Sequence, residues 1–274
     1  MCGATIGGLF IPMTKIDFVR IPSGRFMMGV THGLYPEDGE GPQREVALDS
    51  FEVSATAISN ATFSAFISAS GYITTAELLG GSMVFSGQLQ DPNRYAVPSK
   101  QTPWWRWVPG ACWRRPDGHA TEAPELPAVH ISYLDAIAFC EWAGARLPTE
   151  AEWECAASDQ AGITPHIWQG HFPDAPATPP APKPVQDATP NGNGLYHACG
   201  NVWEWTADKF TCLHSPRAAR NPKGPLNGKL RVVKGGSFLC APSYCARFRP
   251  SSRRGERPEA TAGHTGFRVV SSFT

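Results

Sequence analysis

Residues 128–154 read AVHISYLDAIAFCEWAGARLPTEAEWE, and this stretch carries the clearest signals for the fold. Ser132 is followed three positions later by Asp135, a pattern that forms a capping box and predicts a helix over Tyr133–Ala143. Gly144 ends that helix, because glycine readily takes the left-handed conformation that follows a helix terminus. The centre of the chain therefore contains a short, well-delimited helix.

Few other segments have a helical pattern, and strand-like runs surround them. Thr149-Glu150-Ala151-Glu152 is a second capping box and predicts a helix that starts at Thr149. Another helix is expected over Asn60–Ala69. Residues 17–30 read as two strands around a Pro-Ser-Gly turn, a candidate hairpin, and residues 230–240 and 264–270 read as late strands. This mixture predicts an α+β fold.

The composition indicates a globular chain with much irregular backbone. Hydrophobic residues make up 42% of the 274 positions and charged residues 18%, which is typical of a folded domain. The chain contains 27 glycines, 26 prolines and nine tryptophans, so we expect long irregular segments held by aromatic side chains. We predict a single domain over residues 17–274, preceded by an N-terminal extension at residues 1–16.

The charge balance excludes two general classes of binding protein. Lys and Arg together number 24, as do Asp and Glu. The chain therefore lacks the net positive charge that would attract nucleic acids or anionic membranes. No run of about 20 apolar residues is present, and the N-terminus has no basic segment ahead of its apolar patch. We expect a cytoplasmic protein, monomeric, with no nucleic-acid or membrane partner.

The eight cysteines include one pair with a chemical signal. No C-x-x-C pair is present, and in a reducing compartment most of these thiols should be free. Residues 234–254 read KGGSFLCAPSYCARFRPSSRR and place Cys240 and Cys245 on a short loop. Two thiolates on one loop can bind a soft monovalent ion such as Cu(I), and the flanking arginines favour the thiolate form.

Spacing alone leaves other interpretations of this pair open. Cys240 and Cys245 could be two ordinary buried cysteines, or they could form a disulfide. They could also join Cys212 and His214 in a zinc site, although C-x-H is poor ligand spacing for zinc.

Several motifs together resemble the formylglycine-generating enzyme family, the sulfatase-modifying factors. The resemblance runs from about Phe18 to Val270. Besides residues 128–154 it rests on IPSGRFMMG, DGEGPQREV, FSAFISASGY, PWW, HIWQGHFP, NGNGLYHACGNVWEWTAD, NPKGP, RVVKGGSFLCAPSYC and TGFRVV. GNVWEW and LPTEAEWE occur throughout the wider superfamily, whereas the cysteine pair in GGSFLCAPSYC points to the copper oxidase branch.

The resemblance implies a fold and a reaction. The fold would be the C-type-lectin-like formylglycine-generating fold, which is α+β with little regular secondary structure. The family reaction uses one Cu(I) ion, O2 and a reductant to convert a cysteine in a sulfatase C-x-P-x-R segment into Cα-formylglycine. The partner would be a peptide or protein thiol, such as an unfolded sulfatase.

The resemblance also assigns site residues. The catalytic positions are Cys240, Cys245, Ser237, Trp203, Tyr244 and Arg247, and the substrate groove contains Trp104 and Trp105. Cys240 and Cys245 would hold the copper ion, and Ser237 would donate a hydrogen bond near the oxygen site. Trp203 and Tyr244 would form a pocket wall and Arg247 would give electrostatic support. For Ser237, Trp203, Tyr244 and Arg247, and for both groove tryptophans, a purely structural role is the alternative.

Two departures from the family concern the substrate. Ala57 stands where the family has a glutamate, and Gly81 stands where it has an acid that pairs with the substrate arginine. A desolvated arginine needs a carboxylate partner, so recognition of C-x-P-x-R should be weaker here.

Three further departures place histidines where the family has asparagines. His166 and His197 occupy positions of the two family calcium sites, although Glu204 remains at the second. Calcium prefers oxygen ligands, so we expect the first site to be absent and the second to be weak or absent. The third, His264, lies just before the strand that contains Gly266-Phe267-Arg268. The alternatives for all three histidines are packing, a polar network, catalysis or metal binding.

Two other functions compete with the family reaction. One keeps the copper chemistry but acts on a different thiol or peptide in a biosynthetic pathway. The other is a lectin-like binding module that has kept the fold and lost turnover.

Overall fold

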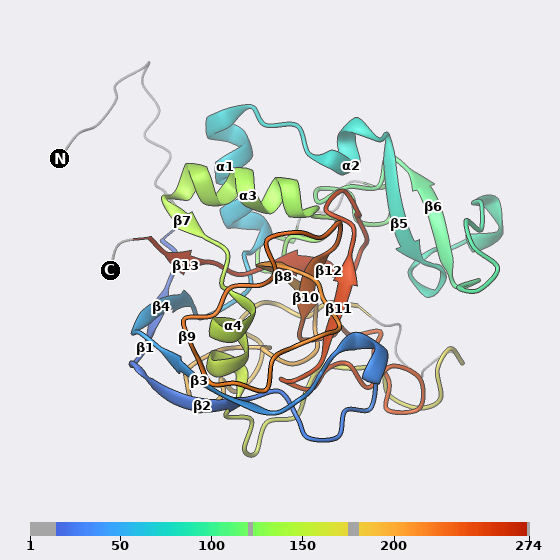
Figure 1. Cartoon of the computed structure of the whole chain (residues 1–274). Coiled ribbons are helices and arrows are strands. Elements are labelled where there is room, and N and C mark those ends of the chain that lie inside the picture. Colours follow the sequence, from blue (N-terminus) through green and yellow to red (C-terminus); the bar gives the residue numbers. More distant parts are fainter. Residues whose placement is uncertain (1–14, 120–122, 175–180, 273–274) are drawn as a thin grey trace.

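Short helices and strands joined by long irregular segments build the computed structural model, which describes residues 15–119, 123–174 and 181–272 (Figure 1). The helices are α1 (Asn60–Ser70), α2 (Thr75–Leu78), α3 (Tyr133–Ala143) and α4 (Glu150–Ala157), and the 3₁₀ turns are η1 (Pro36–Asp38), η2 (Ser86–Gln88) and η3 (Pro92–Arg94). The strands are β1 (Phe18–Ile21), β2 (Gly24–Met28), β3 (Arg44–Leu48), β4 (Phe51–Ser54), β5 (Gly81–Phe85), β6 (Trp105–Pro109), β7 (Ala145–Arg146), β8 (Trp203–Lys209), β9 (Ala219–Arg220), β10 (Arg231–Lys234), β11 (Arg253–Glu256), β12 (Thr265–Phe267) and β13 (Val270–Ser271).

The strands form small sheets of mixed direction. Their orders are β1-β4-β13-β7, β11-β10-β8-β12, β2-β3-β9 and β5-β6. β12 pairs with β8 and β3 pairs with β9 in parallel, whereas the other ladders are antiparallel. The expected α+β architecture with little regular secondary structure is confirmed.

The three helices predicted from capping signals are present. Ser59, Ser132 and Thr149 each accept a hydrogen bond from the backbone of the first helical turn. Gly71 and Gly144 follow α1 and α3 in the left-handed conformation, with φ of 66° and 62°. These helices begin and end where local chemistry satisfies their free backbone groups.

The predicted hairpin at residues 17–30 is wrong. β1 pairs with β4 and β2 pairs with β3, so the two strands lie in different sheets. A two-residue hairpin needs a residue at positive φ in its turn, and neither Ser23 nor Gly24 adopts one. The chain therefore passes from one sheet to the next at this point.

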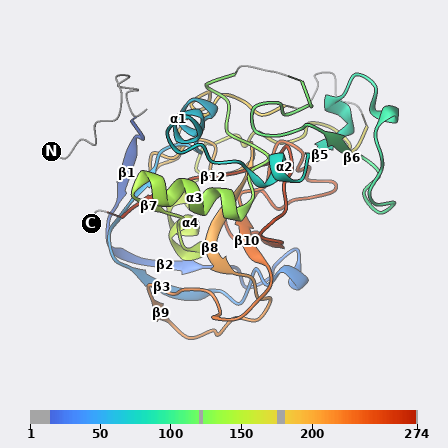
Figure 2. The same cartoon turned by 90° about the horizontal axis from the view of Figure 1, so that it is seen from above.

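The main core is aromatic and lies between the helices and the β8–β10 sheet. Phe63 and Phe66 of α1 contact Phe139 of α3, and Phe267 of β12 packs edge-on against Phe139 at 5.2 Å between ring centroids. Trp205 of β8 is fully buried in the same cluster. Figure 2 shows α1 and α3 together on this side of the molecule.

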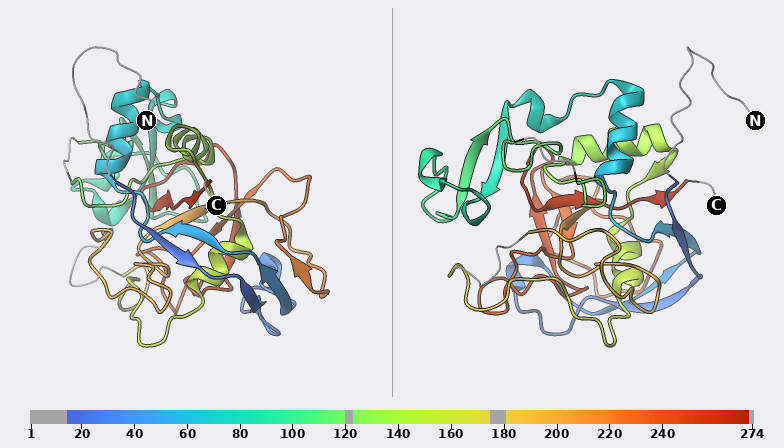
Figure 3. Two further views of the ribbon diagram at one scale, coloured as in Figure 1. Left: turned by 90° about the vertical axis from the view of Figure 1, so that its left-hand side faces the viewer. Right: turned by 180° about the vertical axis from the view of Figure 1, so that it is seen from behind.

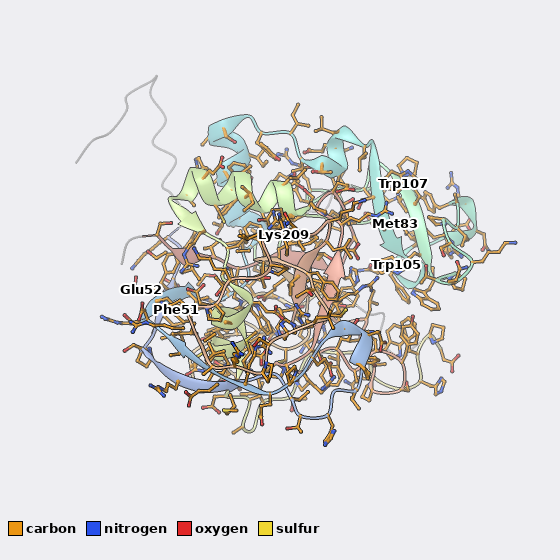
Figure 4. All side chains as sticks on the ribbon, viewed as in Figure 1. Phe51, Glu52, Met83, Trp105, Trp107 and Lys209 are labelled. Carbon is orange, nitrogen blue, oxygen red and sulfur yellow. The ribbon has the colours of Figure 1, made fainter. Side chains whose placement is uncertain are left out.

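The β5–β6 ribbon projects from the body of the molecule (Figures 1 and 3). Phe85 is paired with Trp105 and Met83 with Trp107, and Figure 4 shows Met83, Trp105 and Trp107 on this ribbon. It brings Trp105 beside the late loops that carry the cysteine pair.

Two predictions concern the ends of the chain and the membrane. Most of the expected extension, residues 1–14, lies outside the described residues. Within the described ranges, no helix is long and apolar enough to cross a bilayer.

Candidate functional site

Two glycines turn the chain from β10 into the loop that carries the cysteine pair. Gly235 and Gly236 have φ of 90° and 66°, a conformation that other residues rarely adopt. A Cβ on Gly236 would lie 2.8 Å from the Cα of Phe248. Glycine at 236 therefore lets the two ends of residues 237–249, here called the cysteine loop, approach each other.

Within the cysteine loop, the sulfurs of Cys240 and Cys245 lie 3.3 Å apart. A disulfide would bring them to about 2.0 Å, and both are free thiols. Backbone hydrogen bonds to the carbonyl of Ala241, from Cys245 at 2.7 Å and Tyr244 at 3.0 Å, hold the turn between them. The predicted pair is thus brought together, and a disulfide is not formed.

The alternative zinc site with four ligands is wrong for the described chain. His214 instead has its Nδ1 atom 3.4 Å from a guanidinium nitrogen of Arg44. Cys212 is exposed and lies against the backbone of Gly39. Residues 15–119, 123–174 and 181–272 contain no group of three or more His, Cys, Asp or Glu side chains that could hold a metal ion.

The two thiols have opposite acid–base character. The hydrogen bond with Cys245 and burial together raise the pKa of Cys240 well above that of an ordinary thiol. Hydrogen bonding from Cys240, and then from the backbone and guanidinium of Arg247, lowers the pKa of Cys245 to about 6. At neutral pH the pair therefore consists of a Cys240 thiol that donates to a Cys245 thiolate.

Ser237 lies directly beside the buried sulfur. Its backbone N–H donates to the Cys240 sulfur at 3.4 Å, its hydroxyl acts to lower the pKa of that thiol, and the side chain is inaccessible to solvent. Leu239 in turn donates its N–H to the Ser237 hydroxyl oxygen at 3.3 Å. Ser237 can thus stabilise negative charge on Cys240 when that thiol loses its proton.

An aromatic wall stands next to the pair. Tyr244 stacks on Phe172 with 4.6 Å between ring centroids, and Trp104 meets both rings edge-on at 5.2 and 5.1 Å. Tyr244 is 48% exposed, so part of this wall faces solvent. The wall can offer apolar surface to a peptide that approaches the cysteine loop.

The remaining predicted residues lie at different depths. Trp105 packs against the ring of His264 at 4.7 Å, next to the wall and not within it. Trp203 is buried in the main core cluster that also contains Cys240. Burial lowers the pKa of His264 to about 3, which keeps its ring neutral and favours a packing role.

Sequence reasoning missed Phe172, Tyr35 and Asp38. Phe172 is part of the HFP motif, but nothing in the motif indicates that its ring supports Tyr244. Tyr35 and Asp38 belong to a polar loop without a local signal, and they contact Arg247 across more than 200 positions. The run of arginines after Cys245 could have prompted a search for acidic partners.

A cavity of about 960 Å³ borders the cysteine loop at Phe238. Trp168 lines it and donates its backbone N–H to the carbonyl of Cys240 at 2.9 Å. His166 and His197 also line it, with 6.3 Å between their rings, and burial lowers the pKa of His197 to about 4. The cavity is therefore faced by neutral imidazoles.

The acid retained from the second family calcium site is engaged within the protein. The Glu204 carboxylate accepts hydrogen bonds from the Arg268 guanidinium at 2.6 and 2.8 Å and from the Trp153 indole at 2.6 Å. Because His166 and His197 offer nitrogen and the Glu204 oxygens are already hydrogen-bonded, the side chains at this position are poor ligands for calcium.

The two substrate-related departures are buried positions. Ala57 packs with Val129 and Val202. Gly81 lies in β5, where a Cβ would approach the carbonyl oxygen of Val108 to 2.6 Å. An acidic side chain at 81 would require β6 to move.

Comparisons with known proteins agree with this architecture. The model of the sulfatase-modifying factor enzyme 1-like domain matches residues 12–273. The chain is 45% identical over 280 residues to a formylglycine-generating enzyme of Thermomonospora curvata, with 92% of each chain covered. It is 42% identical over 291 residues to the formylglycine-generating enzyme of Bos taurus, which covers 98% of this chain and 77% of that one. The solved structure of PvdO from Pseudomonas aeruginosa has the same fold, with a TM-score of 0.67, 21% identity and coverage of 92% and 93%.

Proposed function

The chain belongs to the sulfatase-modifying factor enzyme family, and from this premise we propose that it is a copper-dependent oxidase. It uses O2 to convert a cysteine in a sulfatase C-x-P-x-R segment into Cα-formylglycine. The names of its relatives support the cysteine-to-formylglycine conversion. The observation that carries the proposal is the 3.3 Å approach of two free thiols, Cys240 and Cys245.

The donor set fits a soft monovalent ion. Thiolates bind Cu(I) strongly, whereas harder cations prefer oxygen ligands. Cys245 already carries negative charge at neutral pH, and Cys240 would give up its proton on binding the ion, because metal ligation requires a deprotonated thiol. When bound, copper supplies the activation of O2 that thiols alone lack.

The chain's own residues have distinct tasks. Cys240 and Cys245 hold the ion, and Ser237 stabilises charge on the Cys240 sulfur through its N–H and hydroxyl. Arg247 lowers the pKa of the Cys245 thiol and so keeps its sulfur ionised. The wall containing Tyr244 holds the substrate peptide so that its cysteine lies at the pair.

The chemical balance requires a second electron donor. Conversion of the substrate CH2–SH group to an aldehyde removes two electrons from carbon and releases sulfur as sulfide. Reduction of O2 to oxide oxygen takes four electrons, so two more come from an external reductant such as a thiol. With four protons, both atoms of O2 leave as water, and hydrolysis of the resulting thioaldehyde supplies the aldehyde oxygen and releases the sulfide.

A C-x-P-x-R peptide tests this function. The protein is titrated with Cu(I) without oxygen, mixed with peptide and reductant, exposed to O2 and assayed by mass spectrometry. We expect one Cu(I) per chain and conversion of cysteine to aldehyde. Both should be lost in Cys240→Ser and Cys245→Ser, because each removes half of the ligand pair.

Cys155→Ser is the matched control, because Cys155 is also a free thiol but lies on α4. It should retain both copper binding and turnover. Turnover by Cys240→Ser at the wild-type rate, or absence of copper binding in the wild type, would contradict the proposal.

A second substrate class is favoured by Gly81 and Ala57, which replace family acids. With no carboxylate at these positions, a thiol peptide without arginine is the alternative substrate. A panel in which the arginine of C-x-P-x-R is varied separates the two. Turnover that depends on arginine supports the sulfatase segment, whereas indifference to arginine supports the alternative.

We further propose a reducing, cytoplasmic environment for the chain. All seven cysteines in the described residues are free, and a reducing compartment would keep them so. The proposal is tested by thiol counting in protein taken from its native cells without reductant. Oxidised cysteines in that sample would contradict it.

A further inference from the structure

A loop near the start of the chain contacts the cysteine loop through hydrogen bonds and an ion pair. Residues 35–40, here called the clamp loop, contain η1 and lie next to the orange-red segment of the cysteine loop in Figure 1. The backbone N–H of Ala246 donates to the Tyr35 hydroxyl at 2.9 Å. The guanidinium of Arg247 lies 3.8 Å above the Tyr35 ring. One tyrosine thus holds both residues that follow Cys245.

Asp38 holds the same arginine from another side. The Arg247 Nε atom donates to the Asp38 carboxylate in a short ion pair. Asp38 is only 8% exposed, so this pair is shielded from solvent more than a typical surface ion pair. Glu37 also approaches Arg247 at 3.7 Å but is largely exposed. The Tyr35 ring on one face of the guanidinium and the Asp38 carboxylate at its Nε atom together fix the orientation of the Arg247 side chain.

The clamp loop is itself firmly placed. Arg253 donates to the carbonyl of Asp38 at 2.9 Å and forms a buried ion pair with Glu150. Gly39 has φ of 70°, and a Cβ there would lie 2.7 Å from the Cα of Cys212. A loop held this closely on both sides can transmit its position to the cysteine loop.

We propose that Tyr35 and Asp38 are positioning residues that fix Arg247, and through it the sulfur of Cys245, for metal binding. The inference rests on the proposed function, because it concerns how tightly the cysteine pair holds its ion. Arg247 lies two positions after Cys245 and lowers the pKa of its thiol, and Tyr35 accepts a hydrogen bond from the peptide N–H of Ala246 between them. Loss of either contact frees the sulfur to leave the orientation in which it faces Cys240.

The clamp loop offers its own control. Glu40 is 2% exposed and pairs with Arg249, and it also accepts a hydrogen bond from Ser252 at 2.7 Å. This is a buried acid–arginine pair on the same two loops, but its arginine lies four positions beyond Cys245. Removing either acid weakens the packing of the loops, but of these two acids only Asp38 pairs with Arg247, the arginine that lowers the pKa of Cys245.

The test is Cu(I) affinity, measured without oxygen by competition with a chromogenic chelator, together with thermal unfolding. In Asp38→Asn, Cu(I) affinity should fall roughly 10- to 100-fold, the usual effect of a residue that orients a metal ligand. Tyr35→Phe keeps the ring beneath Arg247 and loses only the hydroxyl acceptor, so it should fold and lose less affinity. The ultraviolet thiolate-to-copper absorption should change in both variants.

Glu40→Gln should lower the unfolding temperature but keep Cu(I) affinity within about twofold of the wild type. Equal affinity in wild type, Asp38→Asn and Tyr35→Phe would overturn the inference and leave the proposed function intact. An equal loss in Glu40→Gln and Asp38→Asn would also overturn it, because the effect would then be general loosening. Absence of Cu(I) binding in the wild type would instead refute the proposed function, and the inference with it.

Discussion

At the scale of single residues, the site depends on placing two identical side chains in different surroundings. Cys240 is 2% exposed and bound by its own loop, whereas Cys245 is less buried and the positive charge of Arg247 lowers its pKa. The first environment favours a neutral thiol and the second favours a thiolate. A pair that shares one proton in this way has one ligand ready for a soft ion at neutral pH.

This asymmetry predicts selective alkylation of the metal-free protein. Cys245 should react with iodoacetamide from about pH 6 upward, because its thiolate forms there, whereas Cys240 should remain unmodified. Arg247→Ala removes the positive charge and its N–H donor, so the rate profile of Cys245 should move to higher pH. Peptide mapping by mass spectrometry at a series of pH values measures both effects. Equal reactivity of the two cysteines would contradict this assignment.

At the scale of elements, local signals and distant partners differ in what a sequence reveals. The helices were predictable, because Ser132 and Thr149 cap them within one turn of chain. The partners of β1 and β2 were not, because each pairs with a strand 16 or more positions further along the chain and no turn residue specifies the pairing. The cysteine pair could be found from its spacing. The ion pair of Asp38 with Arg247 could not, because it joins residues more than 200 positions apart.

The ladder that leads into the cysteine loop also contains a buried charge. Lys234 ends β10 with no solvent exposure, and its amine lies 2.8 Å from Glu154 and 3.7 Å from Glu150. Removing one partner of such a pair leaves uncompensated buried charge, which is strongly destabilising. The end of β10, and with it the start of the cysteine loop, should therefore depend on this lysine.

Lys234→Ala should lower the free energy of unfolding by about 3–5 kcal/mol. Urea denaturation followed by fluorescence measures it, and Arg25→Ala is the control. Arg25 pairs with Glu45 at 3.0 Å, but both side chains are exposed, so its loss should cost about 1 kcal/mol or less. Similar losses in the two variants would show that burial does not govern the Lys234 pair.

At the scale of the whole molecule, histidines with buried or partly buried rings link folding to pH. Burial lowers the pKa of His130, His197 and His214 to about 4 and that of His264 to about 3. An unfolded histidine titrates near 6.5, so between these values the unfolded chain binds more protons than the folded one. The contribution of these neutral histidines to the free energy of unfolding is fully present above pH 6.5 and is lost as the pH falls towards 4.

Urea unfolding at pH values between 7 and 4 tests this linkage. The wild type should lose stability throughout that window. His130→Asn should lose less over the same interval, because one fully buried imidazole no longer has to remain neutral in the folded state. A free energy of unfolding that is constant or rises on acidification would contradict the assignment.

The central claim is that the sulfurs of Cys240 and Cys245 together hold one copper ion. X-ray absorption at the copper edge, on protein loaded with one equivalent of Cu(I), tests it most directly. The account predicts a first shell of two protein sulfurs, one of which disappears in Cys245→Ser. A shell of nitrogen or oxygen alone, or one that is unchanged by Cys245→Ser, would contradict it.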